Sequence, residues 1–255
     1  MTCADPDGPA GRVVAHRAGN DPAAAVAALA AGADAVEADV YVFRGRVELR
    51  HARTLGPWWS RRFEVDGWRP RLVPAAHPRP VLADLLAAID PDALVMLDIK
   101  GAGRGGGPAP TPGRPPLAAR FAAGVGARVA AAWAAIAPDR PVIVSAQAWP
   151  ALGAFLLSAP ASDGRARTRP GATVVLSAGT PRQAAAVARR ADGIDGAAIG
   201  LPFALLSAQR AAQMRRVAPR LFAWGLRSAD EVQLARRWGV TDVIVDDLRI
   251  ARRTR

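Results

Sequence analysis

The stretch Leu94-Val95-Met96-Leu97-Asp98-Ile99-Lys100 decides the fold, because a short apolar run that ends in polar side chains is typical of a buried strand in a parallel sheet. Asp98 and Lys100 are two residues apart, so in a strand they lie on the same face. Lys100 is the single lysine among 34 basic residues. An ammonium is a compact point charge that a flat guanidinium cannot replace where space is tight. The position therefore marks a candidate site, although chance would also place one lysine somewhere.

Seven similar runs occur along the chain, and alanine-rich stretches with helical spacing separate them. The predicted strands are residues 12–16, 35–40, 94–99, 141–145, 173–177, 197–201, 221–225 and 242–246. The predicted helices are residues 22–31, 81–89, 117–136, 181–191, 207–217 and 229–238. Eight strands with intervening helices favour an α/β fold, a single closed (β/α)8 TIM barrel over residues 1–255, rather than an open sheet.

Three segments depart from this alternation. Residues 41–49 alternate on both sides of Arg44-Gly45, which predicts a hairpin that returns the chain to His51. Residues 101–116 are rich in glycine and proline, so we expect a flexible loop over the barrel mouth, either a lid or an insertion without function. Residues 249–255 are basic and are expected to form a solvated tail, with contact to a phosphate-rich surface as the alternative.

Composition bounds the class of protein. The chain has 255 residues, 51% of them hydrophobic, and a net charge of +12. The arginines are spread along the chain rather than gathered in one stripe, which argues against nucleic acid as the partner and leaves phosphate-bearing substrates or anionic lipid. The one cysteine, Cys3, cannot form an internal disulfide, and the chain shows neither a signal-peptide pattern nor a charge-free membrane span. We therefore expect a soluble, cytoplasmic protein.

Carboxylates lie at the ends of two predicted strands. Glu37 and Asp39 are two apart near the end of one strand, and Asp98 has the same position on the next. The C-terminal strand ends of a β/α barrel meet at one mouth, so these side chains should lie together. Facing carboxylates repel unless they share a proton or bind a cation, and oxygen ligands favour Mg²⁺ or Ca²⁺. The alternative is that each forms an ion pair with an arginine.

Two of the three histidines are predicted at the same mouth. His16 follows the first strand and His51 follows the hairpin, whereas His77 lies in a proline-rich connection and is expected to have no chemical role. An imidazole with a pKa near 6.5 can serve as a general base or a general acid. His16 and His51 are therefore candidates for acid/base catalysis at one phosphorus.

Taken together, these residues resemble the glycerophosphodiester phosphodiesterase family, which shares its barrel and metal site with sphingomyelinase D-like phospholipases. The resemblance rests on the order His16-Arg17, Glu37-x-Asp39, His51, Asp98-x-Lys100. Two later segments agree with it: Phe222-Ala223-Trp224 and Gly239-Val240-Thr241-Asp242-Val243-Ile244-Val245-Asp246. The resemblance thus spans almost the whole chain.

The resemblance implies a role for each of these residues. One divalent cation, Mg²⁺ or Ca²⁺, would be bound by Glu37, Asp39 and Asp98. His16 and His51 would be the acid/base pair. The substrate-binding residues would be Arg17, Lys100 and Trp224.

The chain also departs from the family pattern. Ala18 stands where the family has glycine, with Gly19 and Asn20 following, and Ala52 stands where it has aspartate. The Pro-Glu-Asn-Thr segment is missing. Asp98 replaces the usual glutamate, as in the sphingomyelinase D-like branch. The departures leave the fold prediction intact and leave the substrate open.

Aromatic and cationic residues follow the second histidine. Trp58, Trp59 and Trp68 lie among arginines and either pack over the barrel rim or allow transient contact with an anionic membrane surface. Three hypotheses result: metal-dependent hydrolysis of a small-molecule glycerophosphodiester to glycerol 3-phosphate and an alcohol, phospholipase D-like cleavage of a lysolipid or sphingolipid, and a catalytically weak binding barrel. The first is the leading hypothesis.

Overall fold

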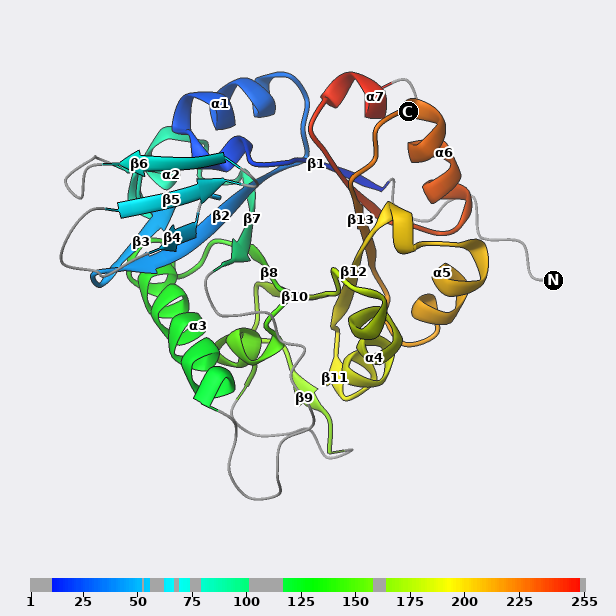
Figure 1. Cartoon of the computed structure of the whole chain (residues 1–255). Helices are drawn as coiled ribbons and strands as arrows, with labels where there is room; N and C mark the ends of the chain where they lie inside the picture. Colours follow the sequence, from blue (N-terminus) through cyan, green and yellow to red (C-terminus); the bar gives the residue numbers. More distant parts are fainter. Residues whose placement is uncertain are drawn as a thin grey trace.

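The computed structural model describes residues 11–51, 53–55, 62–66, 69–73, 79–100, 117–157 and 164–252. They form a barrel of strands enclosed by helices (Figure 1). Within these residues no helix is both long enough and apolar enough to span a bilayer. Several features considered above lie outside the described residues: Cys3, Ala52, Trp58, Trp59, Trp68, His77, the predicted loop 101–116 and residues 253–255.

Eight parallel strands close into a barrel, as the sequence predicts. Their order is β1-β14-β13-β12-β10-β8-β7-β2, and the ring is closed because β1 pairs with both β14 and β2. The strands are β1 (Arg12–Ala15), β2 (Ala35–Phe43), β7 (Leu94–Ile99), β8 (Val142–Ala146), β10 (Ala172–Ser177), β12 (Ala198–Pro202), β13 (Leu221–Trp224) and β14 (Asp242–Val245). The fold is therefore a (β/α)8 TIM barrel.

The helices lie outside the strands, and several begin at a side chain that caps them. Asp21 accepts hydrogen bonds from the backbone of Ala23 and Ala24, and Thr180, Ser207 and Ser228 cap three later helices. The α-helices are α1 (Pro22–Ala30), α2 (Leu82–Ala88), α3 (Leu117–Ile136), α4 (Pro181–Asp192), α5 (Ala208–Arg215), α6 (Ala229–Arg237) and α7 (Leu248–Arg252). The 3-10 helices are η1 (Ala18–Asn20), η2 (Trp149–Phe155) and η3 (Phe203–Leu205).

The inside of the barrel is filled by one apolar layer. Each of the eight strands contributes one buried inward-facing residue: Val14, Ala35, Met96, Ile143, Val175, Ala198, Phe222 and Ile244. A barrel filled in this way is a packed core rather than a pore. The residues two positions later on each strand lie one layer higher on the same inner face, and they form the floor of the site described below.

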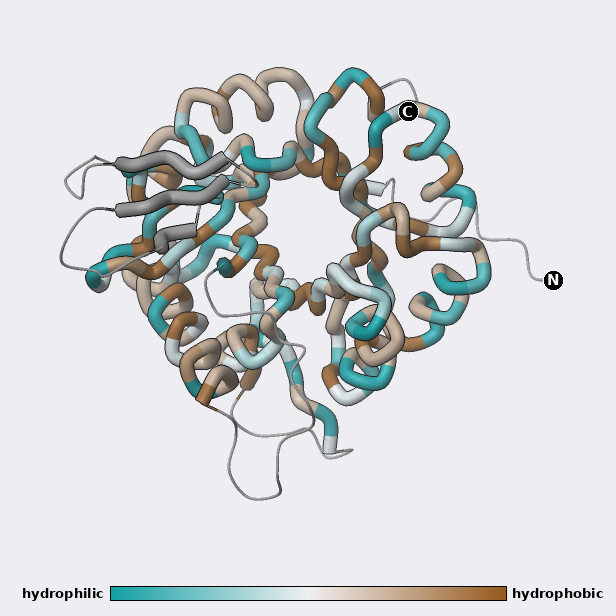
Figure 2. Tube along the Cα trace, viewed as in Figure 1, coloured by the Kyte–Doolittle hydropathy of each residue, from teal (hydrophilic) through white to brown (hydrophobic). Residues whose placement is uncertain are grey.

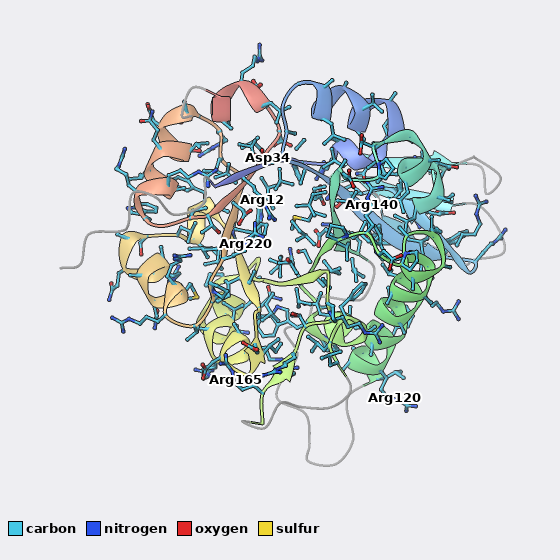
Figure 3. The ribbon with its side chains drawn as sticks, turned by 180° about the vertical axis from the view of Figure 1, so that it is seen from behind. Arg12, Asp34, Arg120, Arg140, Arg165 and Arg220 are labelled. Carbon is cyan, nitrogen blue, oxygen red and sulfur yellow. The ribbon has the colours of Figure 1, made fainter. Side chains whose placement is uncertain are left out.

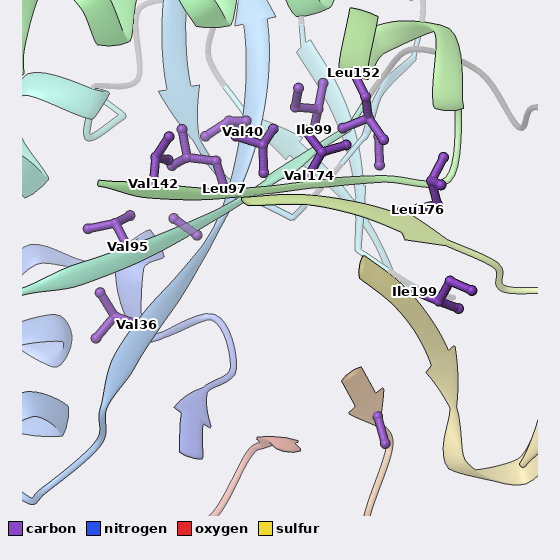
Figure 4. Close-up of a cluster of buried hydrophobic side chains, with 14 of the residues drawn as sticks. Val36, Val40, Val95, Leu97, Ile99, Val142, Leu152, Val174, Leu176 and Ile199 are labelled. Atoms are coloured by element: carbon purple, nitrogen blue, oxygen red, sulfur yellow. The ribbon is translucent and has the colours of Figure 1, made fainter. Parts of the chain in front are cut away.

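The outward faces of the strands form the larger part of the core. Valine, leucine and isoleucine side chains from β2, β7, β8, β10 and β12 pack there, together with Leu152 of η2 (Figure 4). The helices cover these faces, and hydrophilic residues gather on the outer sides of α4, α5 and α6 (Figure 2). Burial of this surface, at about 25 cal/mol per Å² of apolar area, drives the closure of the barrel.

Charged residues close the opposite, N-terminal end of the barrel. Asp242 is fully buried, accepts a hydrogen bond from Thr241 Oγ1 at 2.7 Å and forms an ion pair with Arg220. Arg12 and Arg220 lie near the barrel axis when the molecule is seen from behind (Figure 3). Burial lowers the pKa of Arg12, as does the neighbouring Arg220 guanidinium. This cluster is structural, because it lies at the end of the barrel that faces away from the strand C-termini.

The predicted hairpin is present, and its turn has the expected conformation. Arg44 and Gly45 have φ angles of 49° and 80°, as a two-residue hairpin turn requires, and β3 (Arg46–Leu49) pairs antiparallel with β2. The sequence did not predict two small additional sheets. One consists of β4 (Arg53–Leu55), β5 (Arg62–Asp66) and β6 (Arg69–Val73), and the other of β9 (Ala166–Arg167) and β11 (Ile194–Asp195).

The prediction of a solvated tail over residues 249–255 was wrong for its first part. Residues 249–252 belong to α7, which contacts α6, β1 and β14. Ala251 is 1% exposed, since its methyl group is buried between these elements. The spacing of Leu248, Ile250 and Ala251 was too short a pattern to outweigh the surrounding arginines.

Candidate active site

The site is a ring of side chains one layer above the apolar filling of the barrel. Two residues after each member of the filling, the strands present His16, Glu37, Asp98, Ser145, Ser177, Gly200, Trp224 and Asp246. All of these except Asp246 line a cavity of about 200 Å³, together with Arg17, His51, Lys100 and Gln147. The C-terminal strand ends of the barrel therefore carry the site, as the sequence predicts.

The three predicted metal ligands lie together. β2 and β7 pair in parallel with Asp39 opposite Asp98, and Glu37 lies two residues before Asp39 on the same face. One carboxylate oxygen from each of Glu37, Asp39 and Asp98 lies within 4.8 Å of the others. Glu37 and Asp39 are 2% and 0% exposed.

Lys100 is the cation of this cluster. Its ammonium Nζ is 3.0 Å from Asp39 Oδ1 and also contacts Asp98 Oδ2. Asp39 Oδ1 is buried, and among the described residues its close partner is the Lys100 ammonium, which it shares with Asp98. An incompletely satisfied buried carboxylate oxygen, flanked by two more carboxylates, is a donor set that fits a hard divalent cation.

The cluster shifts the pKa values of its members in different directions. Burial raises the pKa of Glu37 well above its usual range, and the negative charges of Asp39 and Asp98 raise it further. Burial would also raise the pKa of Asp39, but Lys100 and the Asn20 amide outweigh it, so this pKa is lowered. Burial raises the pKa of Asp98 despite the Lys100 contact. Desolvation disfavours the Lys100 ammonium, but the three carboxylates more than compensate and raise its pKa.

Asn20 holds Asp39 in place, a role that the sequence did not predict. The Asn20 Nδ2 donates to Asp39 Oδ2 at 2.8 Å, and the Asp39 backbone N–H donates to Asn20 Oδ1 at 2.8 Å. Gly19 allows η1 to approach β2, because a Cβ on Gly19 would lie 2.7 Å from the Cβ of Ala38. The glycine one place later than in the family pattern thus has a packing role, and the residue after it orients Asp39, one of the three predicted metal ligands.

Arg17 links the carboxylates to a histidine. Its φ of 56° places it in the left-handed region, and its backbone N–H donates to Glu37 Oε2 at 2.7 Å. Its guanidinium donates to His51 Nε2 at 2.8 Å and lies 3.9 Å from Asp39 Oδ2. The positive φ of a non-glycine residue here is local strain at the mouth of the site.

Both candidate histidines lie at the cavity. His16 Nδ1 is 2.6 Å from Asp246 Oδ1, so Nδ1 carries the proton toward the carboxylate. His51 follows Arg50, whose backbone N–H donates to the Asp39 carbonyl at 2.9 Å and whose guanidinium packs over the Tyr41 ring. The hairpin therefore returns His51 to the strand ends. Trp224, the predicted substrate-binding aromatic, is half-buried in the cavity wall.

Five residues of the site were missed by the sequence analysis: Asn20, Ser145, Gln147, Ser177 and Asp246. Ser145 and Gln147 repeat the two-residue spacing of Asp98 and Lys100 at the end of the next strand. Ser177 ends the strand after that. This repeated spacing was the available signal, and neutral side chains made it weaker than the charged pairs.

The fold and the site define a (β/α)8 barrel with carboxylates, imidazoles and one ammonium at its mouth. No protein-family model and no curated protein sequence matches the chain. Solved structures match over nearly its full length. A glycerophosphodiester phosphodiesterase from Thermotoga maritima has a TM-score of 0.65 and 16% identity, with coverage of 97% of this chain and 100% of that chain.

Two further solved structures of phosphodiesterases also match the chain over most of its length. A putative glycerophosphoryl diester phosphodiesterase from Silicibacter pomeroyi has a TM-score of 0.65 and 16% identity over 95% of this chain and 92% of that one. A phosphodiesterase from Oleispira antarctica, solved in complex with the product sn-glycerol-3-phosphate, has a TM-score of 0.59 and 15% identity over 92% of both chains. The chain therefore has the fold of these enzymes, as the resemblance in its motifs implies.

Proposed function

We propose that the chain is a phosphoric diester hydrolase that cleaves a glycerophosphodiester to glycerol 3-phosphate and an alcohol. The observation that carries the proposal is the meeting of three carboxylates, two imidazoles, Arg17 and Lys100 at one cavity. Such a set can bind a phosphodiester, move protons at both of its ester oxygens and compensate its charge. The shared fold and the glycerol 3-phosphate complex of one neighbour support the choice of substrate.

Glu37, Asp39 and Asp98 are proposed as the ligands of one divalent cation, Mg²⁺ or Ca²⁺. Bound there, such a cation would supply Lewis-acid stabilisation of charge on the non-bridging phosphate oxygens. Asn20 holds the Asp39 carboxylate in a fixed orientation, and the Ser145 hydroxyl lowers the pKa of Asp98. Lys100 lies against the same carboxylates and is proposed to contact the phosphate from the side of β7.

Arg17 and the two histidines are proposed to act on the phosphate and its ester oxygens. The Arg17 guanidinium occupies the lone pair of His51 Nε2, so a phosphate that attracts this guanidinium would release the ring for proton transfer. His16 is held by Asp246 with its Nε2 available to the cavity. One histidine would deprotonate the attacking hydroxyl, from water or from the substrate, and the other would protonate the leaving alkoxide.

The test is the release of glycerol 3-phosphate from a series of glycerophosphodiesters with Mg²⁺ or Ca²⁺, with His16→Ala and His51→Ala as controls. We expect release by the wild type and a loss of at least about a hundredfold in each variant, the usual scale of a general acid or base. Product only from acyl-bearing lipids would favour the phospholipase D-like alternative. Turnover unchanged in both variants would exclude catalysis at this site.

We also propose that the protein is cytoplasmic, works in lipid metabolism and folds as one domain. The single cysteine supports a reducing compartment. Transient contact with an anionic membrane is supported by charge, because α4 and α6 end in the exposed residues Arg189, Arg190 and Arg237. If the protein sediments with anionic vesicles but not with neutral ones, and salt weakens this binding, the contact is supported. If equal amounts of protein sediment with both kinds of vesicle, the contact is contradicted.

A further inference from the structure

The cavity has two chemically different halves. β1, β2 and β7 contribute the charged groups, whereas β8, β10, β12 and β13 contribute only neutral ones: Ser145, Gln147, Ser177, Gly200 and Trp224. A phosphodiester also has a charged centre and neutral alcohol moieties. If the phosphate binds to the charged half, the neutral half is the part of the cavity left for an alcohol moiety.

The two serines of the neutral half already have partners. Ser145 Oγ and Ser177 Oγ are 2.6 Å apart, and both side chains are buried. One of the two hydroxyls donates to the other, and either can be the donor. Because the two buried hydroxyls already satisfy each other, they have less capacity left for a ligand.

Gln147 is different, because its backbone is fixed while its side chain is not engaged. The Gln147 carbonyl accepts from Gln183 Nε2 at 3.1 Å, and Gln183 Oε1 accepts from the Gly179 N–H at 3.0 Å. Gln183 is buried and ties the loop after β8 to the loop after β10. Within the described residues, the Gln147 carboxamide lines the cavity without a hydrogen-bond partner of its own.

Gly179 provides the space for this carboxamide. A Cβ on Gly179 would lie 2.9 Å from both Nε2 and Oε1 of Gln147, closer than real Cβ contacts come. The loops after β8 and β10 thus leave room for the Gln147 carboxamide, which can donate and accept hydrogen bonds at the same time. Neighbouring hydroxyl groups of a polyol are the ligands that match such a pair of functions.

We propose that the neutral half of the cavity is a polyol subsite and that Gln147 is its specificity-determining residue. The inference deepens the proposed function and rests on it for the position of the phosphate. The Gln147 carboxamide binds hydroxyl groups of the glycerol moiety, next to the Trp224 ring. A site that hydrogen-bonds a substrate hydroxyl disfavours an analogue that lacks it, because its own polar group is then left without a partner.

The experiment measures the dissociation constants of glycerol 3-phosphate and of methyl phosphate, which lacks the hydroxyls, by calorimetry on metal-loaded protein. We expect the wild type to prefer glycerol 3-phosphate, and Gln147→Ala to weaken that ligand by about tenfold while methyl phosphate binding stays unchanged. Gly179→Ala should have the same selective effect, because its methyl group displaces the carboxamide. Gln213→Ala, an exposed glutamine on α5, is the matched control and should change neither constant.

Each outcome bears on the inference. A loss confined to glycerol 3-phosphate in Gln147→Ala supports it, whether or not Gly179→Ala folds. Equal weakening of both ligands, no change in either, or a wild type that binds methyl phosphate as tightly would overturn it. Selective binding of glycerol 3-phosphate without its release from any diester would contradict the proposed function while the polyol subsite stands.

Discussion

Replacement of Lys100 by methionine tests whether the ammonium is the counter-ion of the carboxylates at the site. The test is sharpest in metal-free protein, because no bound cation then compensates the carboxylates. Methionine keeps an unbranched side chain of similar length and removes the charge. Asp39 is fully buried and Asp98 is 19% exposed, so Asp39 loses its counter-ion inside the protein and Asp98 loses it at the cavity wall. Removal of one partner from a buried ion pair costs about 3–5 kcal/mol.

Two features place the expected loss near the lower end of that range. Asn20 continues to donate to Asp39 Oδ2, and burial already raises the pKa of Asp98, so this carboxyl can take up a proton. We therefore expect Lys100→Met to lower the free energy of unfolding by about 3 kcal/mol at neutral pH. The loss should shrink as the pH falls, because protonated carboxyls need no counter-ion.

The assay is urea unfolding of chelator-treated protein, with Arg227→Met as the control. Arg227 is 86% exposed and lies 3.7 Å from Glu231, so its loss should cost no more than about 1 kcal/mol, as for other surface ion pairs. Mg²⁺ or Ca²⁺ should narrow the gap between Lys100→Met and wild type. A chelated Lys100→Met protein within about 1 kcal/mol of wild type would refute the counter-ion role.

Three further predictions concern the same site. Lys100→Arg should reduce turnover at least about tenfold, or roughly 1.4 kcal/mol of transition-state stabilisation, because a planar guanidinium cannot replace the compact ammonium beside two carboxylates. Near-wild-type turnover would mean that the position of the single lysine has no functional significance. Because the folded-state pKa of Glu37 is raised, chelated wild-type protein should lose stability as the pH rises through that pKa, and Glu37→Gln should not. Urea unfolding between pH 4 and 8 measures this, and a stability of the wild type relative to Glu37→Gln that increases with pH would contradict it. Asn20→Ala should weaken metal binding by about 10–100-fold in calorimetry, since Asp39 loses its orienting partner, and an unchanged affinity would argue against this role.

The barrel itself could be predicted because its strands are short apolar runs at regular spacing. Once residues 94–99 and 35–40 are taken as parallel neighbours, Asp39 and Asp98 must meet at one edge, and the structure pairs them in that register. The hairpin turn at Arg44 and Gly45 was equally local. These features depend on spacing within one segment or between consecutive strands.

What the sequence could not provide depends on contacts between distant segments. The pairing of His16 with Asp246 joins residues 230 positions apart and exists only because β14 closes the ring beside β1. Asn20 reaches Asp39 because it ends the 3-10 helix η1, and this helix is too short to show a hydrophobic periodicity in the sequence. The 3-10 helix η2 between β8 and β10 was not predicted, and α7 is too short for its apolar face to be evident among arginines.

The proposed metal and phosphate site can be tested directly by the structure of a crystal grown with Mg²⁺ or Ca²⁺ and glycerol 3-phosphate. We predict one cation bound by Glu37, Asp39 and Asp98, with the phosphate between Arg17 and Lys100 and the glycerol hydroxyls toward the wall formed by β8 and β10. A cavity in which neither the cation nor the phosphate contacts these carboxylates and cations would contradict it.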